Sequence, residues 1–368
     1  EKIVVIGSGA AAFSFIQNYR ERNTQDIICV FSKEAHPFYN RVLLPEYITE
    51  ELSWEQLLKI KEQHLSTLDI RLFKNNSIVD IDKKSRTLKD SQGIYHAYDK
   101  LIVATGSRAF VPTDVRLDLP GRFTMRDKLD ADRFKKYLMQ SGIPNDQQHV
   151  VIVGGGLLGL ELAAALRHKS VKITIIQRSS YLMERQLDSI ASNMLANNVQ
   201  QRGIQIYFDN EVSTVFDAEE SHSLEVTLKS GKVLEANAIV YAVGTRPNIE
   251  IARKAGLKMG KGLRVNEYMQ TSDASIFALG EIAEFRNQTF GITAAAEEQA
   301  NILANYLAGD ISNPYKGSVL MNILKFEDLD LCSIGQVSVP KNDPSYEEVI
   351  FMDVSKQYYK KCIIKDDL

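Results

Sequence analysis

The sequence predicts an α/β protein with two three-layer units, each built around a parallel sheet, and a small α+β C-terminal domain. An apolar strand at residues 3–6 runs directly into a glycine-rich turn at residues 7–12, and the same pattern recurs at residues 150–159. Glycines let the backbone turn tightly and approach a phosphate, and the N–H groups that open the next helix attract its charge. The two turns therefore predict two Rossmann-like dinucleotide-binding domains.

The composition is that of an ordinary globular chain, since 368 residues of which 44% are hydrophobic can form several cores. A formal net charge of −3 argues against a nucleic-acid partner, which requires a basic surface. Three scattered cysteines fit a reducing compartment, and the chain opens on a strand without a signal-peptide pattern, so we expect a cytoplasmic location. The apolar stretch at residues 150–166 is too short for a bilayer and contains Glu161, so we expect no membrane association.

The other elements follow in chain order from the hydrophobic pattern. After each glycine turn we expect a helix and a second strand, at residues 10–20 and 26–31 in the first unit and up to residue 176 in the second. Further predicted elements are a packing helix at 54–65, a linker at 112–121, a helix at 294–307 and short strands at 314–368.

Three later strands also end in glycine. Residues 101–106 and 238–244 each close a nucleotide-binding unit, where small residues let the backbone pass near a cofactor. The third strand ends at Gly280 and Glu281. An acid there can accept hydrogen bonds from sugar or ribityl hydroxyls, and a solvated acid after a strand is the alternative.

In this order the motifs resemble the two-dinucleotide-binding flavoproteins, the pyridine-nucleotide-dependent oxidoreductases that hold FAD and NAD(P)H. Shorter phrases at residues 39–44, 182–188 and 280–281 are most similar to the N-terminal flavin module of nitrite reductase large subunits and to NADH:rubredoxin reductases. The resemblance covers nearly the whole chain. It implies three domains: FAD-binding at 1–112 and 245–311, NAD(P)H-binding at 113–244, and a C-terminal interface domain at 312–368 that we expect to be incomplete.

The resemblance also implies the site residues. The FAD pyrophosphate would lie along the first turn, and the rest of FAD along five further positions: Gly7, Gly9 and Ala12, then Arg41, Thr105, Gly106, Arg126 and Glu281. NAD(P)H would contact the second turn through Gly154, Gly156 and Gly159, and Gly244 and Gly280 end strands beside the cofactors. Glu161 would lie where the nicotinamide meets the flavin. A functional role is favoured for it because a buried carboxylate without a partner is costly. Arg126 is alternatively a surface arginine.

Two positions depart from the family pattern at the end of the second strand. In the first unit, Ser32 stands where an acid usually binds the adenosine ribose of FAD, and Glu34 can substitute for it. In the second unit, Gln177 and Arg178 stand where an acid would favour NADH, and an arginine can pair with the 2′-phosphate of NADPH. Use of both nucleotides, or a preference for NADPH, is therefore open.

Thiol and metal chemistry are not expected. Residues 37–48, where related disulfide reductases and peroxidases carry active-site cysteines, contain none, and Cys29 fits a buried strand as a small core residue. The six histidines are dispersed without ligand spacing, so we expect no metal site.

We therefore expect a FAD-dependent NAD(P)H oxidoreductase that delivers electrons to an iron-containing one-electron acceptor, either a rubredoxin- or ferredoxin-like protein or a nitrite reductase module. The alternatives are a flavin-binding redox sensor or interaction module, and a peripheral quinone-reducing NADH dehydrogenase. A homodimer is possible.

Overall fold

The computed structural model describes residues 1–218, 222–326, 329–340 and 342–366, so parts of the predicted C-terminal domain lie outside the described residues. The chain divides into two compact units. Unit 1 comprises Glu1–Leu43, Leu52–Arg108 and Thr245–Leu320. Unit 2 comprises Leu44–Glu51, Ala109–Gly244 and Met321–Leu368.

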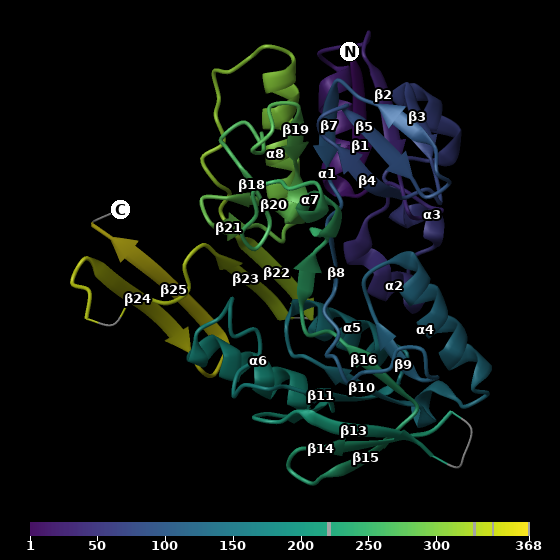
Figure 1. Ribbon diagram of the computed structural model, residues 1–368. Helices are drawn as coiled ribbons and strands as arrows, with labels where there is room; N and C mark the ends of the chain where they lie inside the picture. Colours follow the sequence, from purple (N-terminus) through teal and green to yellow (C-terminus); the bar gives the residue numbers. More distant parts are fainter. Residues whose placement is uncertain (219–221, 327–328, 341, 367–368) are drawn as a thin grey trace. The chain divides into compact units, whose positions relative to one another are not determined.

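Unit 1 is built on a five-stranded parallel sheet (Figure 1). Its strands, in spatial order, are β19 (Ile276–Ala278), β7 (Lys100–Val103), β1 (Lys2–Ile6), β2 (Ile27–Phe31) and β3 (Ile70–Phe73). Helices α1 (Ala10–Arg20) and α8 (Thr293–Leu307) pack together on one face of the sheet. Ile3 of β1 belongs to that core, whereas Val4 belongs to the core on the opposite face. Both faces are thus buried, as is usual for a parallel sheet.

Smaller elements complete unit 1. They are the antiparallel sheet of β4 (Ile78–Asp82), β5 (Thr87–Asp90) and β6 (Tyr95–Ala97), the sheet of β18 (Leu263–Val265), β20 (Ala283–Phe285) and β21 (Gln288–Thr289), α7 (Glu250–Lys254), and 3-10 helices at Arg41–Leu43, Glu62–Leu68 and Gly280–Ile282. Strands β8 (Ser107–Ala109) and β17 (Thr245–Pro247) form a two-stranded sheet.

The predicted helix at residues 54–65 is wrong in its length. Helix α3 covers only Trp54–Leu57, because Leu58 is extended and forms an antiparallel bridge with Tyr39. The backbone N–H of Lys59 also donates to the carbonyl of Phe38 at 2.7 Å. A strand-like contact with a distant segment therefore overrides the helical spacing.

Unit 2 repeats the architecture with a second five-stranded parallel sheet. Its strands, in spatial order, are β12 (Gln205–Tyr207), β11 (Lys172–Ile176), β10 (His149–Val153), β16 (Ala238–Tyr241) and β9 (Arg122–Thr124). Its helices are α2 (Leu44–Ile48), α4 (Lys128–Gln140), α5 (Leu157–His168) and α6 (Ser189–Gln201), with a 3-10 helix at Asn145–Gln147 and an antiparallel sheet of β13 (Val212–Asp217), β14 (Leu224–Leu228) and β15 (Val233–Ala236). The predicted α/β class with two parallel-sheet units is confirmed.

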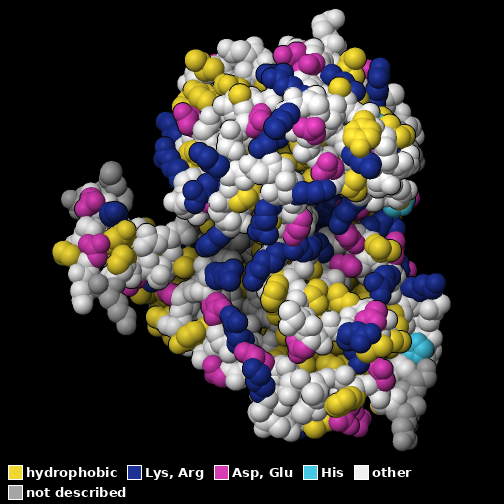
Figure 2. All heavy atoms as spheres, viewed as in Figure 1, with side chains coloured by type: hydrophobic (Ala, Val, Ile, Leu, Met, Phe, Trp, Pro, Cys, Tyr) yellow, Lys and Arg dark blue, Asp and Glu magenta, His cyan; other side chains and the backbone are white. Residues whose placement is uncertain are grey.

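The last strands form two hairpins within unit 2. They pair β22 (Met321–Phe326) with β23 (Leu329–Ile334), and β24 (Tyr346–Asp353) with β25 (Tyr358–Lys365). Both hairpins bond to the 182–188 phrase: Ser333 donates to the carbonyl of Gln186, and Tyr359 to the Asp188 carboxylate, each at 2.5 Å. Phe351 and other hydrophobic side chains of β24 are exposed. Figure 2 shows hydrophobic side chains at the surface of the region that contains β24 and β25.

Helices of the described segments are too short or too polar to cross a membrane.

Candidate functional site

Each glycine turn lies at the carboxyl end of a central strand, β1 in unit 1 and β10 in unit 2. The backbone N–H of Gly7 donates to the carbonyl of Phe31, which ends β2, at 2.9 Å. In unit 2 the N–H of Gly154 donates to the carbonyl of Ile176, which ends β11, at 2.8 Å. The two turns are therefore held to their sheets by the same hydrogen bond.

Glycine is required at the first position of both turns. Gly7 has φ +110°, and a Cβ there would lie 2.1 Å from the carbonyl oxygen of Ala104. Gly154 has φ +112°, and a Cβ there would lie 2.4 Å from the carbonyl oxygen of Ala242. Any side chain would collide with the end of the neighbouring strand and would also be strained in this backbone region.

The helix that follows each turn begins in open space. Gly9 and Gly156 are the N-caps of α1 and α5, and neither helix has a side-chain cap or an acid in its first turn. A Cβ at either glycine would meet nothing within 4 Å. By contrast, α4 and α6 are capped by the carboxylates of Asp127 and Asp188. Helix N-termini without a side-chain cap, which begin at glycines with open space at their Cβ positions, fit the pyrophosphate of a dinucleotide at α1 and at α5.

The third position of the motif differs between the units. A Cβ on Gly159 would lie 2.0 Å from the carbonyl oxygen of Gly154, so glycine lets α5 pack against its own turn. Ala12 stands at the matching place in α1 and is fully buried in the core.

Three predicted FAD residues meet just after β2 in unit 1. Ser32 Oγ lies 2.7 Å from Ser8 Oγ in the glycine turn, and the N–H of Glu34 donates to Ser32 Oγ at 3.1 Å. The Glu34 carboxylate then accepts from Arg41 Nη2 at 2.5 Å and from the Tyr39 hydroxyl at 2.8 Å. Two residues after Ser32, an acid therefore follows β2 and is paired with an arginine.

A second predicted group lies on the other side of the same turn. The Cβ position of Gly7 is 3.2 Å from the backbone nitrogen of Thr105, and the carbonyl of Gly106 accepts from Asn248 at 2.9 Å. Gly280 has φ +77° and lies against α1, because a Cβ there would approach the Cβ of Ala11 to 3.1 Å.

Glu281 follows at the start of a 3-10 helix, and its Oε2 accepts from Ser107 Oγ at 2.7 Å. Unit 1 therefore brings the predicted FAD residues to both sides of the first turn, with the exception of Arg126.

In unit 2, Gln177 is occupied by the turn itself. Its Oε1 accepts from the N–H of Gly155 at 2.8 Å, and its Nε2 donates to Ser179 Oγ at 2.8 Å and to the carbonyl of Tyr181 at 2.9 Å. Arg178 is exposed. The pKa of Glu211 is lowered mainly by its hydrogen bond to Lys229 and, to a smaller extent, by the charge of Arg178. Of the two predicted selectivity residues, Arg178 is therefore the one whose side chain reaches solvent.

Glu161 lies on α5, in the second turn of the helix, and is partly buried. Burial and, as the smaller cause, the nearby charge of Glu46 together raise its pKa to about 7. Glu46 lies on α2, which packs against α5, and burial raises its pKa as well. Its Oε2 is buried without a hydrogen-bond partner.

The sequence analysis missed Glu46. The available signal was an acid within the otherwise apolar Leu44–Ile48 segment.

Arg126 and Gly244 also belong to unit 2. Arg126 follows β9, and its N–H donates to Asp130 Oδ2 at 2.9 Å. Gly244 has φ +102°, and its carbonyl accepts from the N–H of Phe110 at 2.9 Å.

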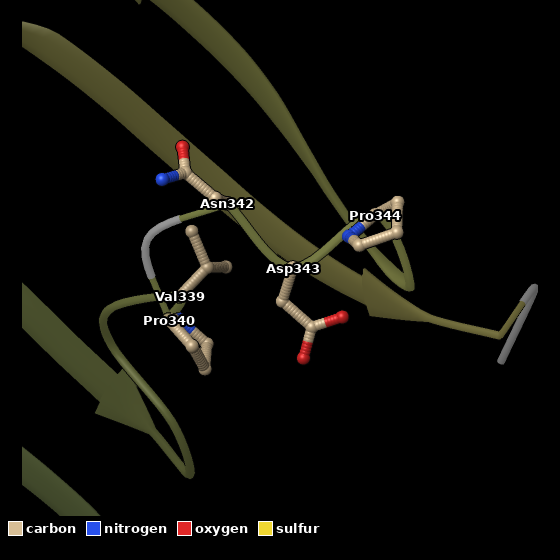
Figure 3. A pocket seen from close by; sticks show the side chains of 5 residues that line it. All are labelled: Val339, Pro340, Asn342, Asp343 and Pro344. Atoms are coloured by element: carbon tan, nitrogen blue, oxygen red, sulfur yellow. The ribbon is translucent and has the colours of Figure 1, made fainter.

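Metal ligands and a surface hollow are two further features of the described chain that bear on a site. Within the described ranges, no three His, Cys, Asp or Glu side chains are grouped to hold a metal ion. An open hollow lies in the loop between β23 and β24, but its polar side chains, Asn342 and Asp343, point in different directions (Figure 3). Asp343 also caps its own turn by accepting from the N–H and the hydroxyl of Ser345.

Comparison with protein families gives two matches. Residues 1–300 match the pyridine nucleotide-disulphide oxidoreductase family, and residues 321–368 match the rubredoxin NAD+ reductase C-terminal domain.

The chain is similar to curated proteins of nitrogen metabolism. It is 30% identical to the assimilatory nitrate reductase electron transfer subunit of Bacillus subtilis (strain 168), over 100% of this chain and 46% of that protein. It is 29% identical to nitrite reductase [NAD(P)H] of the same organism, over 99% of this chain and 44% of that protein. The chain thus spans less than half the length of these relatives.

Among solved structures, NADH:rubredoxin oxidoreductase from Clostridium acetobutylicum superposes with a TM-score of 0.80 at 25% identity, over 99% of this chain and 88% of that chain. These matches confirm the resemblance that the motifs indicated.

Proposed function

Because the chain belongs to the pyridine nucleotide-disulphide oxidoreductase family, we propose that it passes electrons from NAD(P)H, through bound FAD, to a separate iron-containing one-electron acceptor. The observation that carries the proposal is the pair of glycine turns, one in each unit, each followed by a helix whose first N–H groups are uncapped and open. Family membership confirms the predicted enzyme class and the cofactor pair FAD and NAD(P)H. When bound, flavin accepts two electrons as a hydride and releases them singly.

In this proposal unit 1 binds FAD. The N-terminus of α1, entered through Gly9, takes the pyrophosphate, since a helix N-terminus carries about half a positive charge. Glu34, held by Arg41, accepts from the adenosine ribose. Glu281, which accepts a hydrogen bond from Ser107, offers a carboxylate acceptor to the flavin end of FAD.

Unit 2 binds NAD(P)H. The N-terminus of α5, entered through Gly156, takes the pyrophosphate, and Arg178 can pair with a 2′-phosphate. Glu161 holds a proton over part of the neutral range, because its pKa is raised to about 7. A neutral carboxyl can both donate and accept a hydrogen bond, which suits it to bind the nicotinamide carboxamide.

The acceptor is proposed from the comparisons. The C-terminal match is to a rubredoxin NAD+ reductase domain, and a similar solved structure is an NADH:rubredoxin oxidoreductase. A rubredoxin-like or ferredoxin-like protein, or a nitrite reductase module, would take single electrons. A cytoplasmic location and a homodimer complete the proposal; cell fractionation and light scattering test them.

The decisive experiment is an anaerobic absorbance titration of the purified chain with NADH and, separately, with NADPH. We expect bound flavin to be bleached by at least one nucleotide, followed by reduction of added rubredoxin or ferredoxin. A chain that binds FAD but is reduced by neither nucleotide, or that reduces no one-electron acceptor, would contradict the proposal.

A further inference from the structure

Three polar side chains of unit 1, Asn76, Asp90 and His96, form a cluster that no proposed step uses. Asp90 Oδ2 accepts from Asn76 Nδ2 at 2.9 Å and from His96 Nε2 at 2.8 Å. Asn76 is 4% exposed and Asp90 is 1% exposed. A buried polar network that is fully satisfied holds its surroundings in one arrangement. We name these three residues the Asp90 cluster.

The Asp90 carboxylate is anchored at both oxygens. Its Oδ1 accepts from the backbone N–H groups of Gln92 at 3.0 Å and Ile94 at 2.9 Å, in the turn between β5 and β6. Burial opposes ionisation, but the hydrogen bonds from His96, Asn76 and these two N–H groups outweigh it and lower the pKa of Asp90. The charged carboxylate is acceptor-only, so it binds all four donors.

The Asp90 cluster is connected to the loop after β2 through Asn76. The backbone N–H of Asn76 donates to the carbonyl of Ser32 at 2.8 Å, and that of Asn75 donates to the carbonyl of Glu34 at 3.3 Å. Ser32 Oγ continues the path to Ser8 Oγ, at 2.7 Å in the glycine turn. A continuous hydrogen-bonded path thus joins the cluster to the first turn.

His96 also supports the end of β2 by packing. The centroid of its ring lies 4.7 Å from the ring centroid of Phe31, the last residue of β2. It lies 5.7 Å from the ring centroid of Phe73, the last residue of β3. The two phenylalanines are stacked at 4.5 Å. The imidazole therefore lies against the strand ends from which the Ser32 loop departs.

We propose that the Asp90 cluster is a positioning device for the cofactor, holding Ser32 and Glu34 in the arrangement that binds the adenosine end of FAD. The inference rests on the proposed function, in which the loop after β2 takes the ribose. The three side chains act through the backbone of Ser32 and Glu34 and not by touching the cofactor.

The test uses the full chain freed of flavin. FAD is titrated by flavin fluorescence, and ADP, which carries only the adenosine end, by calorimetry. We expect Asn76→Ala and His96→Phe to raise the Kd of both ligands about tenfold, which equals about 1.4 kcal/mol. His96→Gln, which keeps a donor toward Asp90, restores most of the affinity. Binding of NADPH in unit 2 stays at its wild-type value.

A milder variant serves if Asn76→Ala does not fold. Ser91 Oγ donates to Asn76 Oδ1 at 2.9 Å and accepts from the N–H of Ser77 at 3.2 Å, so Ser91→Ala loosens the Asn76 side chain but keeps its bond to Asp90. We expect it to raise the Kd of FAD about twofold, at the weak end of hydrogen-bond contributions.

The matched control lies at the other end of β2. Asp26 accepts from the Tyr19 hydroxyl at 2.6 Å and from Asn23 Nδ2 at 3.1 Å, so Asp26→Ala removes partly buried hydrogen bonds away from the loop. We expect it to lower the melting temperature without changing either Kd. Cluster variants that lower the melting temperature but bind FAD and ADP as tightly as wild type would overturn the proposal. A wild-type chain that binds neither ligand would refute the proposed function itself.

Discussion

The two units carry the same turn but finish their second strand differently. In unit 1, the short Ser32 side chain meets Ser8 of the glycine turn, and the acid comes two residues later as Glu34, bound to Arg41. In unit 2, the longer Gln177 side chain reaches the N–H of Gly155, and the exposed residue that follows it is Arg178. One scaffold thus presents an anchored acid in unit 1 and an exposed base in unit 2, which suits two different adenosine ends.

A further difference lies two residues beyond the motif. Glu161 of α5 corresponds to Ser14 of α1, five residues after Gly156 and Gly9. At this helix position only unit 2 has a carboxylate, and Glu46 of α2 lies near it. In the proposed function the shared features bind phosphate, and the features that differ contact different parts of the two cofactors.

The largest expected effect is the loss of stability when alanine replaces the first glycine of a turn. Replacement of the N-cap glycine, two residues later, should cost much less. Gly7→Ala and Gly154→Ala place a Cβ against a carbonyl oxygen at positive φ, so each should cost about 3 kcal/mol of stability, and chemical denaturation would measure it. Gly9→Ala and Gly156→Ala enter open space and should leave stability nearly unchanged. We expect Gly9→Ala to lose FAD and Gly156→Ala to lose NAD(P)H. If Gly9→Ala or Gly156→Ala lost both cofactors equally, the assignment of FAD to unit 1 and NAD(P)H to unit 2 would be contradicted.

The intermediate effect concerns pH. The pKa of Glu161 is raised in the folded state from its ordinary value of 4.5 to about 7. Its contribution to stability is therefore fully present below pH 4.5 and is lost as the pH rises through about 7. Because the side chain is partly solvated, we expect a loss of about 1–2 kcal/mol across this window, below the full value of about 1.4 per pKa unit.

Glu161→Gln should remove that loss, so that denaturation midpoints of variant and wild type agree at low pH and diverge above neutrality. The matched unit 1 variant, Ser14→Ala, should show no such divergence. A wild-type curve that is flat between pH 4.5 and 8 would contradict the raised pKa.

The smallest effect concerns the choice between nucleotides. Arg178→Ala should lower kcat/KM for NADPH about tenfold relative to NADH, because one charge-assisted contact to the 2′-phosphate contributes about 1.5 kcal/mol. Steady-state kinetics with both donors measure this ratio, and Arg185→Ala, another exposed arginine further along the same segment, is the control. An unchanged ratio would show that Arg178 does not read the phosphate.

Much of the fold was predictable because its signals are local. The strand, glycine turn and helix at residues 3–20 and at 150–166 follow from hydrophobic runs and from the backbone freedom of Gly7 and Gly154. The helix expected at 54–65 shows the limit, since the bridge between Leu58 and Tyr39 ends it early. Spacing along the chain contains no information about such a partner.

The sequence by itself determined that there are two dinucleotide units, where their turns lie, and that Glu161 is an acid on an apolar helix. Only the tertiary structure decided that Glu46 lies near Glu161, that Gln177 bonds to Gly155, and that Asn76 bonds to both Asp90 and Ser32. The physical reason is that glycine stereochemistry and hydrophobic period act within a few residues. Buried polar contacts depend instead on strand order and register, which bring distant segments together.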